Sequence, residues 1–461
     1  MEKLSDKADY FYVSGNSEAS EHSNLLNNLT TLNNESDNYF NLSCSNCNQE
    51  DVINQFSDYI NIENNLEYPN KIYGFNELLN NQRNQIDKIN SDIWKKIRWY
   101  INQYDFLVKD PIINRAFYKY WEIINRFNIF EHFDPEKDII FHCAEAPGGF
   151  VQGSNVFLGL DGSNRNNKSK TRVKKVSIID DDGFTTVCSQ KPEKIKYKIF
   201  TISLNKNLPQ YKFYNLPSYN DNVINKYVYI TYGKDHTGDI NNLQNINYVK
   251  EIANKYSNSS DFYLITADGG FDEGTDFNNK EQLHYFLILN EIYTAMTLQK
   301  EGGSFILKVF DIFTDTSIHL LYLLNILYEE VYIYKPLTSR PTNSEKYVIC
   351  KKFRKFDLNT YSSMKKKIHN LSENIKKRNL KYCTFKLFKT IPDEFIENIK
   401  NMNMKLLNKQ CFFLDKAILY CNDTEFIKNY ENELFNSIEK RKEVFHEWIS
   451  TYNLNKYITK I

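Results

Sequence analysis

The spacing of apolar residues separates an aperiodic N-terminal region from a helical one. Residues 1–75 are rich in Asn, Ser, Asp and Glu and show almost no period, so we expect them to be disordered or loosely packed. Between residues 76 and 110 apolar positions recur at steps of three and four, which predicts amphipathic helix. These positions include Ile86, Ile89, Ile93, Ile97 and Tyr100. A second helix should follow Pro111.

Further along the chain, short apolar runs alternate with helical segments. The runs lie at 138–144, 196–204, 226–233, 261–270 and 302–310, with helical patterns at 281–299 and 317–330. This alternation predicts an α/β fold with a doubly wound, mostly parallel sheet. The last two runs, 331–337 and 346–353, are separated only by 338–345. That link is too short for a crossover helix, so the last strand should be antiparallel.

Two other regions complete the predicted organisation. Residues 161–195 are long, polar and charged, and we expect an insertion there and no core. Residues 356–461 return to helical patterning with Lys-rich faces and should form a helical appendage. The α/β domain is therefore expected over 111–355, after the helical lead-in at 76–110.

Composition limits what the chain can bind and where it works. The 58 Lys and Arg balance the 58 Asp and Glu, so a nucleic-acid enzyme of this kind must hold its basic residues in a local groove. The eight cysteines are irregularly spaced. Cys44 and Cys47 lack a second pair at zinc-ligand distance, so we expect free thiols and no metal. The polar start and the short apolar run 318–328 predict a soluble protein without membrane contact.

Several positions carry chemistry that a core or turn would not need. Pro147-Gly148-Gly149 and Asp268 follow apolar runs, at the strand ends where open sheets bind ligands. Taken singly, a tight turn, a turn-forming Asp, a surface Glu345 and a snorkelling Lys119 are ordinary readings of these residues. Lys308 differs, because burying a lysine inside a strand costs free energy unless the lysine has an ionic partner or a function.

Together these motifs resemble the FtsJ-like ribose methyltransferases, and specifically the Adrift-type group that contains the cap 2′-O-methyltransferases. The resemblance runs from about Arg115 to Phe353 and is closest at 267–272 and 302–353. In this chain the sequence TADGG stands where the ribosomal-RNA members have a Ser-Asp-Met-Ala-Pro type motif, which favours the cap enzymes. The resemblance implies a Rossmann-like methyltransferase sheet, S-adenosyl-L-methionine as cofactor and capped RNA as substrate.

The resemblance also implies roles for individual residues. The family's Lys-Asp-Lys-Glu tetrad falls on Lys119, Asp268, Lys308 and Glu345. The cofactor would be held by Ala144, Glu145, Ala146, Pro147, Gly148, Gly149, Phe150 and Asp239. RNA would be contacted by Asn278 and Asn343. The chain departs from the pattern at Glu145-Ala146, where many relatives have Gly, and in the length of its insertion.

The expected reaction is an in-line displacement by a ribose hydroxyl, which must be positioned and lose its proton. We expect Lys308 to act as the base, with a pKa lowered by burial and by the nearby cation of Lys119. In a second assignment Lys308 only positions the hydroxyl, and the proton is lost late. Methylated guanine should stack on aromatic side chains.

Three alternative functions are compatible with an α/β sheet of this type. The chain could methylate ribosomal or other internal RNA, or it could be a silent methyltransferase fold that binds RNA. A dinucleotide oxidoreductase is disfavoured, because no G-x-G-x-x-G opens a helix after the first strand. The resemblance and the Asn-, Lys- and Ile-rich composition point to a large cytoplasmic DNA virus. We therefore expect a cytoplasmic or virion location, with the nucleus as alternative, and a capping-machinery protein as partner.

Overall fold

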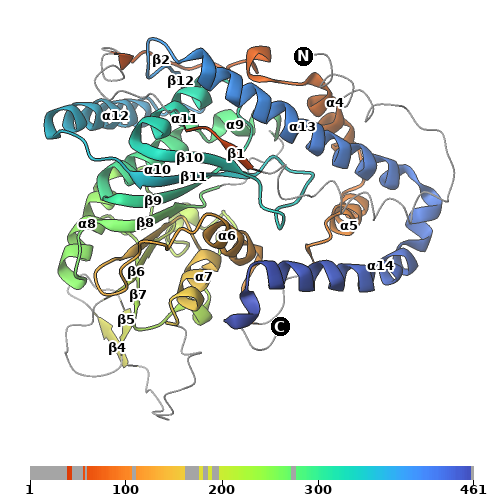
Figure 1. Cartoon of the computed structure of the whole chain (residues 1–461), viewed down its shortest axis with the longest axis horizontal. Helices are drawn as coiled ribbons and strands as arrows, with labels where there is room; N and C mark the ends of the chain where they lie inside the picture. The colour runs from red at the N-terminus through yellow and green to blue at the C-terminus, as the bar shows by residue number, and fades with distance from the viewer. Residues whose placement is uncertain are drawn as a thin grey trace.

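A computed structural model of the chain places most of the predicted strands in one large sheet (Figure 1). It describes residues 39–43, 55–57, 60–105, 111–160, 176–179, 185–188, 197–270 and 277–457. Cys44 and Cys47 lie outside these residues, as do residues 1–38. The main sheet has eight strands in the order β1-β10-β11-β9-β8-β3-β6-β7.

Five neighbouring strands of this sheet run parallel. They are β7 (Val228–Thr231), β6 (Ile199–Ile202), β3 (Ile140–Cys143), β8 (Phe262–Ala267) and β9 (Gln299–Val309). Every residue of β3, β6 and β8 is buried, because both faces of a parallel sheet are covered by helices. Alternate side chains enter opposite cores, so that Ile140 and Phe141 belong to different apolar clusters.

The other edge of the sheet is antiparallel, as predicted. Strand β11 (Lys346–Phe353) lies between β9 and β10 (Tyr328–Tyr334) and is antiparallel to both. The predicted mostly parallel α/β sheet with an antiparallel last strand is therefore confirmed.

Helices cover both faces of the sheet (Figure 1). One layer consists of α6 (Arg115–Arg126) and α7 (Gly149–Phe157), which pack in the same apolar cluster. The other contains α8 (Leu243–Tyr256), α10 (Tyr285–Leu298), preceded by the short α9 (Lys280–Leu283), and α11 (Asp315–Leu327). Alternating strands and helices thus give the doubly wound arrangement.

The helical lead-in consists of two helices, α4 (Glu77–Ile86) and α5 (Ser91–Ile101). The side chain of Asn90 accepts hydrogen bonds from the backbone N–H groups of Asp92 and Ile93, which caps α5 and separates it from α4. The buried residues are Leu79 and Gln82 in α4 and Ile97, Tyr100 and Ile101 in α5.

Parts of the N-terminal region join the fold as strands, whereas the composition predicts a disordered or loosely packed segment over residues 1–75. Strand β1 (Tyr39–Asn41) pairs with β10, and β2 (Ile62–Glu63) pairs with β12 (Thr384–Phe385). Leu42 is fully buried. Edge strands gain their hydrogen bonds from distant partners, so local composition did not reveal them.

The insertion and the C-terminal region complete the fold. Strands β4 (Val176–Ile179) and β5 (Thr185–Cys188) form their own two-stranded sheet, apart from the main one. The C-terminal helices are α12 (Leu358–Arg378), α13 (Asp393–Asn422) and α14 (Thr424–Thr451). Short 3-10 turns occur at Lys71–Tyr73, Pro209–Tyr211, Asp221–Val223, Phe277–Asn279 and Leu454–Lys456.

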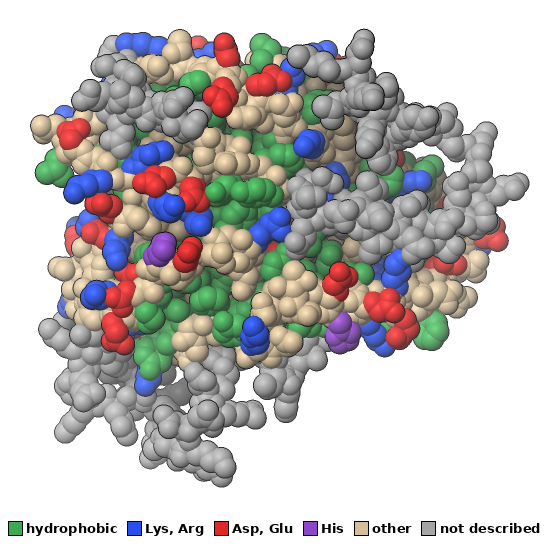
Figure 2. Space-filling view, viewed as in Figure 1, with side chains coloured by type: hydrophobic (Ala, Val, Ile, Leu, Met, Phe, Trp, Pro, Cys, Tyr) green, Lys and Arg blue, Asp and Glu red, His purple; other side chains and the backbone are tan. Residues whose placement is uncertain are grey.

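The surface agrees with a chain of balanced charge. Figure 2 shows acidic and basic side chains interspersed over the described part of one face. Among the described residues, no helix is long and apolar enough to cross a membrane.

Candidate active site

The four tetrad residues meet at the carboxyl ends of the parallel strands. Asp268 follows β8 directly, and Lys308 is the penultimate residue of β9. Glu345 precedes β11, whose antiparallel register places Tyr347 opposite Lys308. Lys119 comes from the first half of α6. Ligands of open α/β sheets bind at this edge.

The four side chains form two ion pairs. Lys119 Nζ lies 2.6 Å from Glu345 Oε1, and Lys308 Nζ lies 3.4 Å from Asp268 Oδ1. Lys308 also donates a 2.7 Å hydrogen bond to the main-chain oxygen of Asp268. Each side chain keeps 12–16% of its surface exposed, so the group is sheltered but can be reached by a ligand.

The charge state of Lys308 corrects the expectation of a lowered pKa. Burial acts to lower the pKa of Lys308, but the attraction of Asp268, Glu345 and Glu291 outweighs it and raises the pKa. The cation of Lys119 does not offset this, because Lys119 pairs with Glu345. Burial would raise the pKa of Glu345, yet Lys119 and Lys308 together lower it. Lys308 is therefore an ammonium and Glu345 a carboxylate at neutral pH.

Two buried glutamates lie beside the tetrad. Glu291, on α10, accepts a 3.2 Å hydrogen bond from the N–H of Gly269. Burial raises the pKa of Glu291 to about 8, although Lys308 acts to lower it. Burial, and next the charge of Asp268, raise the pKa of Glu145. Sequence analysis missed Glu291 because nothing separates a carboxylate on a buried helix face from a surface one until the packing is known.

The loop after β3 combines a glycine that packing requires with a buried carboxylate oxygen. Gly148 has φ of +110°, and a Cβ there would lie 2.9 Å from Val223, so a larger residue would be strained. Glu145 accepts a 2.5 Å hydrogen bond from the N–H of Phe150 through Oε1. Its Oε2 is buried and has no hydrogen-bond partner among the described residues. A buried oxygen without a partner suits a cationic or hydrogen-donating ligand.

The loop that follows β6 is hydrogen-bonded to the loop after β3 and to the loop after β7. The N–H of Ala146 donates to Ser203 Oγ at 2.8 Å, and the N–H of Asn205 donates to Thr237 O at 2.9 Å. Asp239 accepts a 2.9 Å hydrogen bond from the N–H of Asn241. Burial raises the pKa of Asp239. The predicted cofactor residues 144–150 and Asp239 thus lie on connected loops at one edge of the sheet.

The two predicted RNA contacts lie differently. Asn343 is two residues from Glu345, and its main-chain and side-chain oxygens accept hydrogen bonds from Lys335 at 2.7 and 3.2 Å. Asn278 is exposed and donates to Asn84 of α4 at 3.1 Å. It belongs to the segment leading to Lys280, whose Nζ lies 4.0 Å from the Phe310 ring centroid. Asn278 is therefore at the rim, outside the hydrogen-bonded centre.

A buried glutamate connects the two elements that supply Lys119 and Glu345. Glu122, one turn after Lys119, accepts from Leu337 N at 2.5 Å, Thr338 Oγ1 at 3.1 Å and Trp448 Nε1 at 3.1 Å. It also accepts from the hydroxyl of Tyr334. Because Trp448 lies on α14, the C-terminal region takes part in holding the site.

Helix α13 supports the same loop from another side. Gln410 Nε2 donates to Thr342 O at 3.3 Å. Leu406 and Leu407 line a small cavity beneath the loop together with Asn343 and Ser344. No group of three or more potential metal ligands occurs within the residues that the structure describes.

Comparison with known proteins relates the site to RNA-modifying enzymes. Residues 182–353 match the family described as FtsJ-like methyltransferase. The chain is 30% identical over 206 residues to Cap-specific mRNA (nucleoside-2′-O-)-methyltransferase 1A of Caenorhabditis briggsae. It is 29% identical over 206 residues to the Inactive cap-specific mRNA (nucleoside-2′-O-)-methyltransferase 1B of the same organism. Each alignment covers 44% of this chain and 24% of the relative, so the chain matches about a quarter of their length.

A solved ribosomal RNA methyltransferase of Plasmodium falciparum aligns with 52% of this chain and 97% of its own, at 19% identity and a TM-score of 0.31. A likeness at this level supports no statement about substrate.

Proposed function

We propose that this chain transfers a methyl group from S-adenosyl-L-methionine to the ribose 2′-hydroxyl of a cap-proximal nucleotide of mRNA. The observation that carries the proposal is the pair of ion pairs, Lys119–Glu345 and Lys308–Asp268, at the carboxyl edge of a doubly wound sheet. The similarity to cap-specific 2′-O-methyltransferases supports this choice of substrate. Capped RNA is the partner that follows from it.

The residues at this edge fit a cationic cofactor. Four carboxylates, Glu145, Asp268, Glu291 and Glu345, interact with two ammonium groups, Lys119 and Lys308. Glu145 and Glu291, whose pKa values burial raises, can ionise beside the sulfonium and ammonium charges of S-adenosyl-L-methionine. The loop 144–150 and Asp239 would hold the cofactor, which supplies an electrophilic methyl group when bound. Glu145 Oε2 would gain the donor that it lacks.

The raised pKa of Lys308 supports the second assignment considered for this lysine. As an ammonium, Lys308 binds and orients the ribose oxygen, and it does not remove the proton at the start. The hydroxyl proton leaves late, once that oxygen has become acidic. Asp268 Oδ1, 3.4 Å from Lys308 Nζ, can receive it. Tyr347 donates a 2.9 Å hydrogen bond to the same oxygen and keeps the carboxylate in place.

A methyl-transfer assay tests the proposal. Transcripts of one sequence, capped and uncapped, are incubated with labelled cofactor and purified protein, and the modified nucleotide is identified by mass spectrometry. We expect 2′-O-methylation next to the cap and little on uncapped RNA. Equal transfer to both would indicate an internal-RNA enzyme.

Cofactor binding without product on any RNA would indicate a silent fold, a real alternative because one relative is described as inactive. A capping-machinery partner, a cytoplasmic location and a viral source stay predictions of the sequence.

A further inference from the structure

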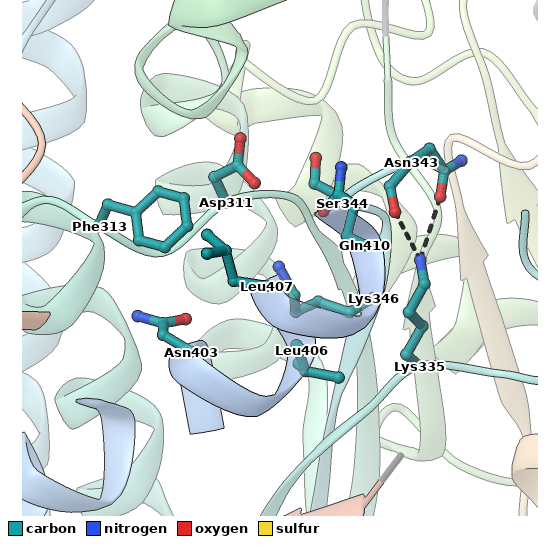
Figure 3. Close-up of a pocket in the computed structure, with 10 residues that line it drawn as sticks. All are labelled: Asp311, Phe313, Lys335, Asn343, Ser344, Lys346, Asn403, Leu406, Leu407 and Gln410. Carbon is teal, nitrogen blue, oxygen red and sulfur yellow. Dashed lines mark hydrogen bonds between the residues drawn. The ribbon is translucent and has the colours of Figure 1, made fainter. Parts of the chain in front are cut away.

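Lys335 is a buried lysine, 7% exposed, that follows β10 directly. It donates three hydrogen bonds: to Asn343 O at 2.7 Å, to Asn343 Oδ1 at 3.2 Å and to Glu345 O at 2.9 Å. Figure 3 shows its side chain pointing toward Asn343, with the two bonds to that residue drawn. All three acceptors belong to the segment 343–345.

This segment is short and carries two residues of the candidate site. Its neighbours offer further support, since Ser339 Oγ donates to Glu345 Oε1 at 3.0 Å and Gln410 supports Thr342. Ser339 Oγ also donates to Asn343 Oδ1 at 3.5 Å, so Ser339 reaches the two side chains, whereas Lys335 binds the main-chain oxygens of both residues. A buried ammonium is costly unless its donors are satisfied, and here segment 343–345 supplies all three acceptors.

We propose that Lys335 is a positioning residue, whose ammonium fixes segment 343–345 so that the Asn343 amide and the Glu345 carboxylate meet the RNA and Lys119 correctly. This inference rests on the proposed function. Lys335 acts through the loop, because its nitrogen is occupied by loop oxygens.

The charges around Lys335 make the arrangement sensitive to pH. Burial lowers the pKa of Lys335 to about 7; Glu345 acts to raise it, and Lys346, Lys119 and Lys409 lower it further. These groups lie on the loop, β11, α6 and α13. A neutral amine has two N–H donors where the ammonium has three. The segment should therefore be held less tightly as the pH rises above neutrality.

The test compares Lys335→Met, Lys335→Arg and a matched control, Lys346→Met, in the full chain. Lys346 is equally buried, but its Nζ donates to Phe310 O and not to the loop. We expect Lys335→Met to lower kcat/KM for capped RNA by about tenfold to hundredfold. The dissociation constant for S-adenosyl-L-methionine should change less than about twofold. Lys335→Arg, which keeps its charge at all pH values, should retain a larger share of its pH 7 activity at pH 8.5 than the wild type does.

A double-mutant cycle separates positioning from general destabilisation. If Lys335 acts through Glu345, Lys335→Met should add little to the loss caused by Glu345→Gln, whereas Lys346→Met should combine with it additively. Additive losses for Lys335→Met would overturn the proposal, and so would an equal coupling of both lysines to Glu345.

Amide hydrogen exchange provides a readout that does not need activity. Lys335→Met should speed exchange at 339–345 and leave β8 and β9 unchanged. Unchanged exchange in the loop would refute the positioning role of Lys335, even if the wild-type chain methylates no RNA. If the wild type is inactive and the variant shows faster loop exchange, the proposed function is refuted, but the positioning role of Lys335 is supported.

Discussion

The two ion pairs of the site are built in different ways. Asp268 and Lys308 lie at the ends of β8 and β9, adjacent parallel strands whose register is fixed by the sheet. Lys119 and Glu345 come from helix α6 and from a loop, and they meet through a 2.6 Å ion pair. The first pair depends on the sheet itself. The second depends on whatever holds α6 and the loop together.

What holds them together is partly the C-terminal region. Glu122 binds the loop at Leu337 and Thr338 and accepts a hydrogen bond from Trp448 of α14. Trp121 Nε1 donates to Tyr452 O at 3.0 Å. A helical region first expected to be an appendage therefore braces one half of the site and leaves the other half to the sheet. Substitutions in the brace, the hydrogen bonds of Glu122 to the loop and to Trp448, should affect the two ion pairs unequally.

The largest effect is expected from the strand-borne pair. Lys308→Ala removes the ammonium that orients the ribose oxygen, and kcat should fall by about 10³-fold or more. Binding of S-adenosyl-L-methionine, measured by calorimetry, should survive. Lys300→Ala is a matched control, since Lys300 lies at the other end of β9 and pairs with Asp138 at the opposite edge. A Lys308→Ala variant that keeps more than a tenth of wild-type turnover would remove Lys308 from the mechanism.

The helix–loop pair should come next. Lys119→Met leaves Glu345 without its partner, and we expect kcat/KM for RNA to fall about a hundredfold. Restoring the positive charge with Lys119→Arg should recover part of this loss. A full loss in the Arg variant would mean that the shape of Lys119, and not its charge, is what the site requires.

Loss of hydrogen bonds from Glu122 should reduce activity less than the substitutions of Lys308 and Lys119. It should disturb only the Lys119–Glu345 pair. Glu122→Gln keeps the size of the side chain but replaces one acceptor oxygen by a donor, so at least one of its bonds is lost. We expect a roughly tenfold fall in kcat/KM for RNA and a loss of about 1–3 kcal/mol in unfolding free energy. Hydrogen exchange should rise at 337–345 and stay constant at 268–270. A uniform rise at both places would show that the two halves are not independent.

The contrast also explains what the sequence could predict. The strand ends at Asp268 and Lys308 follow from apolar runs and turn residues, which are local signals. The brace does not, because Glu122 and Trp448 are 326 positions apart and no periodicity links them. Likewise, β1 joins the sheet through β10 on the strength of a distant pairing. The expected low pKa of Lys308 was wrong because the number of carboxylates around it depends on packing that the sequence does not show.

The remaining expected effect is one on stability, and it concerns the strand-borne half alone. Glu291 lies under the Asp268–Gly269 turn, and burial raises its pKa to about 8, compared with 4.5 for a free glutamate. A group whose pKa is raised by folding stabilises the fold fully below pH 4.5, and this contribution is lost as the pH rises through 8. Glu291→Gln still accepts the N–H of Gly269 but cannot ionise. The stability of the wild type relative to this variant should therefore fall between pH 5 and pH 8, by about 1.4 kcal/mol for each pH unit. Parallel stability curves across that range would show that Glu291 stays ionised, which would give Lys308 a third permanent anionic neighbour and strengthen its hold on a proton.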